Sequence, residues 1–159
     1  MTIDPVTKTR EIPLPVEEAF KLFTQGLDTW WPLETYAIGP SERGEAPVAV
    51  RFEDRVGGRV VEILSDGTEH SWADVIAWNP PERFVLAWHP NLEPTAASIL
   101  EVRFTSSGGG STLYLEHRGW EEFGERGLAI RNEYGPGWDR VLAGFGRSGD
   151  LVEEAPVSR

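Results

Sequence analysis

The chain has 159 residues, which fits one domain of ordinary size and disfavours a second full domain. Its hydrophobic content of 40%, with seven Trp and seven Phe, excludes a wholly disordered chain. The 15 Lys and Arg against 26 Asp and Glu give a formal charge of -11, which disfavours binding to nucleic acid or to anionic membranes. No apolar run reaches the length of a membrane helix and no secretory signal is visible, so we expect a cytoplasmic protein.

The first part of the chain predicts a strand and two short helices. Residues 7–12 mix β-branched and charged side chains, as expected for a first strand. Residues 15–25 have acidic side chains near their start and apolar ones on a single face, which predicts an amphipathic helix that ends at Gly26. A second short helical turn should follow and carry Trp30 and Trp31.

From residue 48 the sequence predicts six consecutive strands. Apolar and polar residues alternate there, and Gly-Gly, Asp-Gly and Gly-rich segments mark the turns. Short strands that follow one another without an intervening helix favour antiparallel pairing, because parallel strands need long crossovers. The predicted strands cover residues 48–53, 59–64, 69–78, 84–88, 100–104 and 113–117.

The last part of the chain predicts one long helix. After Gly119 the alternation stops, and apolar residues recur at helical spacing behind Pro136. Gly144 and Gly146 lower the intrinsic stability of this helix, so the sheet should hold it by packing. We therefore expect a single folded domain over residues 1–150 and a disordered tail over residues 151–159.

Several spaced motifs carry a resemblance to a known family. They are Trp30-Trp31-Pro32, Arg55-Val56-Gly57-Gly58-Arg59, Asp66-Gly67, Trp78-Asn79-Pro80-Pro81-Glu82-Arg83, Leu86-Ala87-Trp88, Leu115-Glu116-His117 and Gly137-Trp138. In this order they resemble the Aha1-like branch of the START/Bet v 1-like (SRPBCC) superfamily, where Aha1 stands for activator of Hsp90 ATPase. The similarity covers roughly residues 7–148.

The resemblance implies an α+β helix-grip fold. This fold has a curved antiparallel sheet of about seven strands, two short helices after the first strand and a long C-terminal helix. Members of the superfamily share a cavity between the sheet and that helix, which holds apolar or aromatic molecules. Some relatives shape polyketides, and others sequester toxic natural products.

Two polar residues stand out on strands whose neighbours are apolar. Asp74 is predicted to share one strand face with Trp72, Ile76 and Trp78, and His117 to share another with Leu113 and Leu115. A structural ion pair would satisfy the carboxylate, and a hydrogen-bonded core position would satisfy the imidazole. Alternatively, both side chains project into the cavity and orient a ligand. As a dyad they could perform acid–base catalysis, with the carboxylate raising the imidazole pKa.

The aromatic residues and one arginine add to the predicted site. Trp side chains can fill a core, or their rigid rings can leave space and line a small-molecule pocket. Arg59 could pair with surface acids or could bind a carboxylate or phenolate at the pocket mouth. We expect the ligand site to comprise Phe52, Arg59, Trp72, Asp74, Trp88, Val102, Leu115, His117 and Trp138.

The sequence thus predicts binding of a hydrophobic or aromatic small molecule, of unknown identity, in a cavity between the sheet and the C-terminal helix. One alternative is a cyclase- or dehydratase-type enzyme that uses His117 and Asp74. Another is an Hsp90 co-chaperone-like interaction module. The eukaryotic activator carries a separate chaperone-binding domain, for which 159 residues leave no room, so we do not expect Hsp90 to be a partner.

Other site types are not expected. His70, His89 and His117 lack the spacing of metal ligands, so the sequence predicts no metal. The turn at residues 108–111 joins two strands and has no following Lys, so it is not a phosphate-binding loop, and no cofactor is expected. The sequence does not decide between a monomer and a homodimer.

Overall fold

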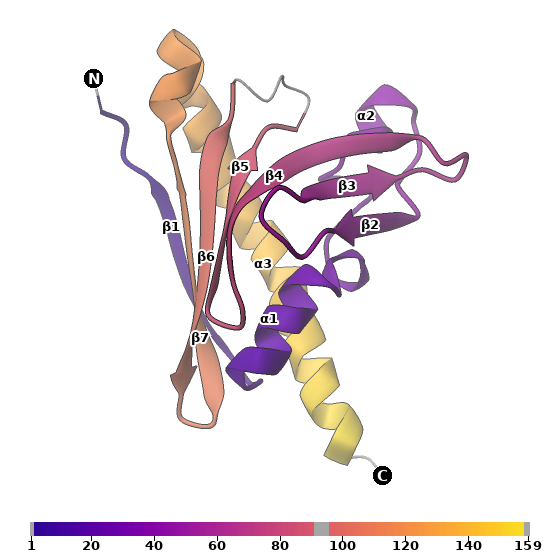
Figure 1. Ribbon diagram of the computed structural model, residues 1–159, viewed down its shortest axis with the longest axis vertical. Helices are drawn as coiled ribbons and strands as arrows, with labels where there is room; N and C mark the ends of the chain where they lie inside the picture. Colours follow the sequence, from indigo (N-terminus) through magenta and orange to yellow (C-terminus); the bar gives the residue numbers. More distant parts are fainter. Residues whose placement is uncertain (1, 91–95, 158–159) are drawn as a thin grey trace.

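Figure 1 shows the protein as a computed structural model that describes residues 2–90 and 96–157. The strands are β1 (Val6–Ile12), β2 (Ala49–Phe52), β3 (Arg59–Ile63), β4 (Glu69–Asn79), β5 (Arg83–Trp88), β6 (Ser98–Ser107) and β7 (Gly110–Arg118). The helices are α1 (Val16–Thr24), α2 (Gly39–Glu42) and α3 (Gly127–Val157), and two 3-10 segments are η1 (Leu27–Thr29) and η2 (Trp120–Arg126).

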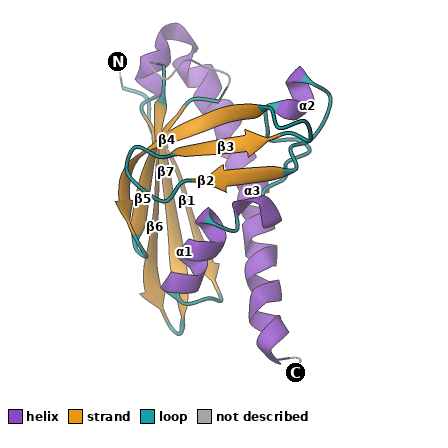
Figure 2. Ribbon diagram, turned by 45° about the vertical axis from the view of Figure 1, so that its right-hand side comes forward, coloured by secondary structure: helices purple, strands orange, loops and turns teal. Residues whose placement is uncertain are grey.

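One curled sheet organises the molecule. Its seven antiparallel strands run in the order β1-β7-β6-β5-β4-β3-β2, so β2 to β7 form a meander and β1 closes the far edge beside β7. Helices α1 and α3 lie against the sheet (Figure 2), and α3 buries Trp138, Val141, Leu142 and Phe145. The predicted α+β helix-grip fold, including all six strands after residue 48, is confirmed.

The long helix begins earlier than the sequence predicted. We expected it to start behind Pro136, because Pro suits the first turn of a helix and disrupts its interior. Helix α3 instead starts at Gly127 and contains Pro136. Ile130 and Tyr134 pack against the core, and this packing outweighs the weak periodicity of the first turns.

The short helical segments also differ in part. Helix α1 matches the prediction, but the 3-10 turn η1 ends at Thr29, immediately before Trp30 and Trp31. The loop that follows leads into α2, which the sequence did not predict. This loop contacts β4 through Trp31, whose ring lies 5.2 Å from that of Trp72, and it forms one wall of the site described below.

The phenylalanines fill one part of the core, which we call the closed end: Phe20, Phe23, Phe84, Phe104 and Phe145. Phe23 lies at the centre, with its ring centroid 5.2 Å from that of Phe145 and 5.6 Å from that of Phe84. Edge-on and tilted contacts at these distances are favourable, and none of these five residues lines the cavity described below. The closed end therefore clamps α1 and the second half of α3 to the sheet.

The C-terminal end of the chain bears on the predicted boundary of the folded domain. Helix α3 continues to Val157, beyond residue 150, where the sequence predicted the end of the folded domain. The disorder predicted for residues 151–159 stays a prediction, and residues 158 and 159 lie outside the described residues. Among the described helices, none is long and apolar enough to cross a membrane.

Candidate functional site

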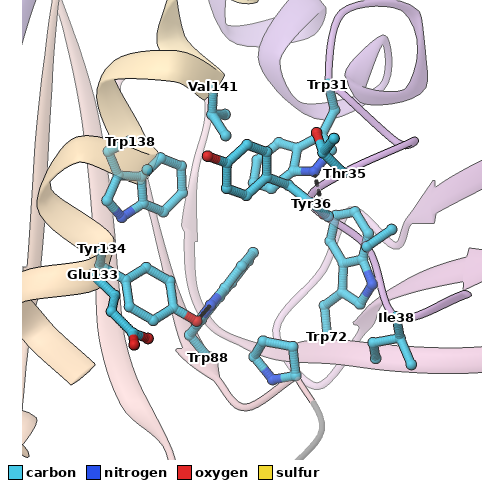
Figure 3. Close-up of a pocket in the computed structure, with 13 residues that line it drawn as sticks. Trp31, Thr35, Tyr36, Ile38, Trp72, Trp88, Glu133, Tyr134, Trp138 and Val141 are labelled. Carbon is cyan, nitrogen blue, oxygen red and sulfur yellow. Dashed lines mark hydrogen bonds between the residues drawn. The ribbon is translucent and has the colours of Figure 1, made fainter. Parts of the chain in front are cut away.

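A cavity of about 270 Å³ lies between α3, strands β4 and β5, and the loop after η1. Figure 3 shows α3 side chains on one side of it, loop side chains opposite, and strand residues across the base. Its aromatic walls, which we call the open end of the core, are Trp31, Tyr36, Trp72, Trp88, Tyr134 and Trp138. The volume is far above the about 30 Å³ that one water occupies in the liquid.

The four indole rings contact one another without stacking flat. The ring of Trp31 lies 5.2 Å from that of Trp72 and 5.7 Å from that of Trp138, centroid to centroid. The ring of Trp88 lies 6.0 Å from both Trp72 and Trp138. The cavity lies among these tilted and edge-on rings.

Every wall indole donates its N–H group within the protein. Buried indole nitrogens normally require such an acceptor. The acceptors are the Tyr36 carbonyl for Trp31 (2.7 Å), Glu62 Oε1 for Trp72 (2.6 Å), the Tyr134 hydroxyl for Trp88 (3.0 Å) and His117 Nδ1 for Trp138 (3.0 Å). These bonds fix the rings in place.

A fully buried carboxylate, Glu62, supports the loop side of the cavity. Its Oε1 accepts hydrogen bonds from the Ile38 backbone N–H and the Trp72 indole, both at 2.6 Å. Its Oε2 accepts one from the Gly39 backbone N–H at 2.8 Å and lies 3.1 Å from His70 Nδ1. Glu62 thus ties the loop to β3 and β4, and it is a positioning residue.

Asp74 does not face the cavity, because the first of two bulges in β4 reverses the alternation just before it. Trp72 has no partner in β3, and Ile76 has none in β5. Each extra residue moves the following side chains to the other face. Ala73 and Val75 are therefore buried, while the Asp74 side chain is 39% exposed. The expectation that Asp74 shares a face with Trp72 was wrong.

The Asp74–His117 dyad is not formed. Asp74 Oδ2 lies 3.1 Å from His89 Nε2, whereas His117 Nε2 lies 2.7 Å from Ser98 Oγ. Asp74 thus follows the alternative of a structural pair on the outer side of the sheet. Within residues 2–90 and 96–157, no group of three His, Asp or Glu side chains is placed to bind a metal ion.

His117 is a buried, uncharged support for the cavity wall. Its Nδ1 accepts from the Trp138 indole, so Nε2 carries the proton and donates to Ser98 Oγ. The Ser98 hydroxyl lies 3.4 Å from the Trp88 carbonyl, which completes the chain. Burial lowers the pKa of His117 to about 3. With both nitrogens engaged and a low pKa, His117 cannot serve as the predicted general base.

Four other predicted site residues lie away from the cavity. Phe52, Val102 and Leu115 are buried but do not line it, because the rings of the closed end and the sheet interior surround them. Arg59 lies on the surface, with Nη2 3.8 Å from Glu69 Oε1. This is the surface pairing that the sequence left open as an alternative.

The cavity combines predicted and missed residues. Of the predicted ligand-site residues, Trp72, Trp88 and Trp138 line it. The sequence analysis missed Tyr36 and Tyr134, because loops have no periodicity and the start of α3 was not recognised. Glu62 was also missed, although it shares a strand face with the apolar residues Val60 and Leu64. An acidic residue on an apolar face is the same signal that drew attention to Asp74.

Solved structures show what the chain is similar to. Txn09, described as an anthrahydroquino-gamma-pyrone synthase complexed with SUM, is 30% identical, with a TM-score of 0.57 over 81% of this chain and 85% of that chain. The AHSA1-like protein from Aeromonas hydrophila is 15% identical, with a TM-score of 0.66 over 94% of each chain. An Aha1 dimer from Colwellia psychrerythraea is 12% identical, with a TM-score of 0.64 over 91% of this chain and 94% of that chain. The last two show the fold alone.

The family assignment depends on the sequence as well as on the fold. No protein of curated function matches the chain in sequence. The family model described as "Activator of Hsp90 ATPase homolog 1-like protein" matches residues 13–147, which is most of the chain. The curled sheet and the long helix agree with this match. The chain belongs to the Activator of Hsp90 ATPase homolog 1-like family.

Proposed function

We propose that the protein binds a flat hydrophobic or aromatic small molecule in the cavity at the open end. The observation that carries this proposal is a cavity of about 270 Å³ whose walls include four Trp and two Tyr rings. Ligand pockets in proteins typically measure about 300–1,000 Å³ and combine apolar walls with a few polar groups. A volume just below this range favours a compact ring system.

The structure offers a way to close the cavity without disturbing the core. Gly137 of α3 lines the cavity, and a Cβ added there would meet only Tyr36 Cε1, at an ordinary 3.7 Å. Gly135 lies two residues earlier, and a Cβ there would meet nothing within 4 Å. Gly137→Leu should therefore fill the cavity, while Gly135→Leu is a matched control on the same helix.

The test is isothermal titration calorimetry with two compact ring probes, 1-indanone and indane. The wild type and Gly135→Leu should bind both, and Gly137→Leu should bind at least about tenfold more weakly. Equal melting temperatures of the two variants would show that the loss is local. No binding to the wild type, or equal binding by Gly137→Leu, would contradict the proposal. A native mass spectrum of protein from its own host would identify a retained ligand.

A second candidate is an enzyme that acts on an aromatic substrate. It is favoured by the 30% identity to Txn09, which is described as a synthase. Because His117 and Asp74 are engaged elsewhere, the ionisable groups available at the cavity are Tyr36, Glu133 and Tyr134. Conversion of a bound aromatic ligand by the wild type, and its loss in Tyr134→Phe, would support this candidate over simple binding.

The alternative of a protein-interaction module depends on the exposed apolar side chains. The exposed large apolar side chains among the described residues lie on different segments: Val48, Val56, Ile76 and Leu128. An Hsp90-binding module would require an exposed apolar surface. Co-precipitation with the bacterial Hsp90 tests that alternative, and the native mass spectrum also tests for a homodimer.

A further inference from the structure

The polar groups of the cavity are few, and most are already engaged. The four wall indoles donate their N–H groups inside the protein, so they offer ring faces and edges to a guest. Glu133 is exposed at the rim, where water competes for its carboxylate. Tyr36 OH accepts a hydrogen bond from the exposed Arg140 guanidinium at 3.0 Å, so it also lies near solvent.

Tyr134, like Tyr36, has no described acceptor for its hydroxyl proton, but its hydroxyl bonds to the buried Trp88 rather than to an exposed side chain. Its hydroxyl oxygen accepts the Trp88 indole N–H at 3.0 Å, and no described residue accepts a hydrogen bond from its proton. Figure 3 shows this hydroxyl beside Trp88 at the cavity. The Tyr134 ring packs against buried rings, with centroids 4.8 Å from His117 and 5.3 Å from Trp120. The donor is therefore held in one orientation with its proton uncommitted.

The geometry points to Tyr134 as the hydrogen-bond donor that selects the ligand: a flat aromatic ketone, whose carbonyl oxygen accepts from Tyr134 while its ring lies among the indoles. This inference deepens the proposed function and depends on it. The hydrogen bond that Tyr134 accepts from Trp88 polarises its hydroxyl and strengthens its donation. An electron-poor aromatic ketone also complements the negative faces of indole rings.

The protonation state of Tyr134 is consistent with this role. Burial raises the pKa of the Tyr134 phenol, against a smaller lowering by the Trp88 hydrogen bond. The phenol thus keeps its proton at neutral pH and can donate. A guest that offers only donors would bury the Tyr134 proton without a partner, which is costly.

The test compares 1-indanone with indane, which has a methylene in place of the carbonyl, on the wild type and Tyr134→Phe. Loss of one neutral hydrogen bond should weaken 1-indanone binding about five- to tenfold, while indane binding should change less than about twofold. Tyr114→Phe is the matched control, because Tyr114 lies on the outer side of β7 and donates to Glu116 at 2.9 Å. It should leave both affinities unchanged.

The outcomes separate this inference from the proposed function. If Tyr134→Phe weakens both probes equally, the ring shapes the cavity but its hydroxyl does not select the ligand, and the inference is wrong. The same holds if Tyr36→Phe, rather than Tyr134→Phe, causes the loss specific to the ketone. If the wild type binds indane and 1-indanone and Tyr134→Phe changes neither, the inference falls and the proposed function stands. If the wild type binds neither probe, both the inference and the proposed function are wrong.

Discussion

The closed and open ends of the core are both built from aromatic side chains in contact with one another, yet the cavity lies in the open end. In the closed end, Phe23 lies 5.2 Å from Phe145, and in the open end Trp31 lies 5.2 Å from Trp72. The two sets of rings differ in the N–H group of indole, which Phe lacks. The N–H hydrogen bond of each wall Trp fixes the direction of its ring, whereas a Phe ring has no polar atom to satisfy and is oriented by packing alone.

The largest expected effect comes from breaking the closed end. Phe84 is fully buried, with its ring 5.6 Å from that of Phe23 and 5.3 Å from that of Phe52. Phe84→Ala should lower the free energy of unfolding by about 3–5 kcal/mol, because it removes the ring and leaves a void. Urea denaturation measures this loss. A loss below about 1.5 kcal/mol would mean that the closed end is not tightly packed.

A smaller effect is expected where a carboxylate supports the open end. Glu62→Gln replaces an acceptor of several N–H donors with an amide that donates, and it should destabilise the protein by about 2–3 kcal/mol. It should also weaken 1-indanone binding, because Trp72 and Ile38 lose their anchor. The control is Glu69→Gln, at an exposed pair with Arg51 whose loss should cost under about 1 kcal/mol. Equal losses in both variants would contradict the supporting role of Glu62.

The smallest effect concerns pH and His117, which backs the open end. Its pKa of about 3 in the folded state lies below the ordinary 6.5, so the unfolded state binds a proton that the folded state excludes. Stability is therefore complete above about pH 6.5 and falls at lower pH, approaching about 1.4 kcal/mol per pH unit. His117→Asn should remove this slope between about pH 5 and 6.5, whatever its absolute stability. Parallel stability profiles of the wild type and His117→Asn would contradict the low pKa.

The sequence predicted the strands because their alternation and turn residues are local signals. Residues 59–64 and 69–78, for example, appear as β3 and β4 within a residue or two. The side-chain directions in β4 could not be predicted in the same way. Its two bulges arise from pairing with β3 and β5, and a single extra residue turned Asp74 outward.

The candidate site was predicted in part for a related reason. Trp72, Trp88 and Trp138 lie on elements whose periodicity showed in the sequence, so their inward direction could be expected. Tyr36 lies on an irregular loop, and Tyr134 precedes the Pro136 that concealed the first turns of α3. Their positions depend on tertiary packing, which no local pattern encodes.

The concentration of Trp at the open end has a spectroscopic consequence. Four of the seven Trp residues border the cavity, and aromatic ketones quench indole emission on contact. Binding of such a guest should therefore dim the intrinsic fluorescence of the protein without any attached label. An optical titration of the unmodified chain can then report how much of the sample is occupied.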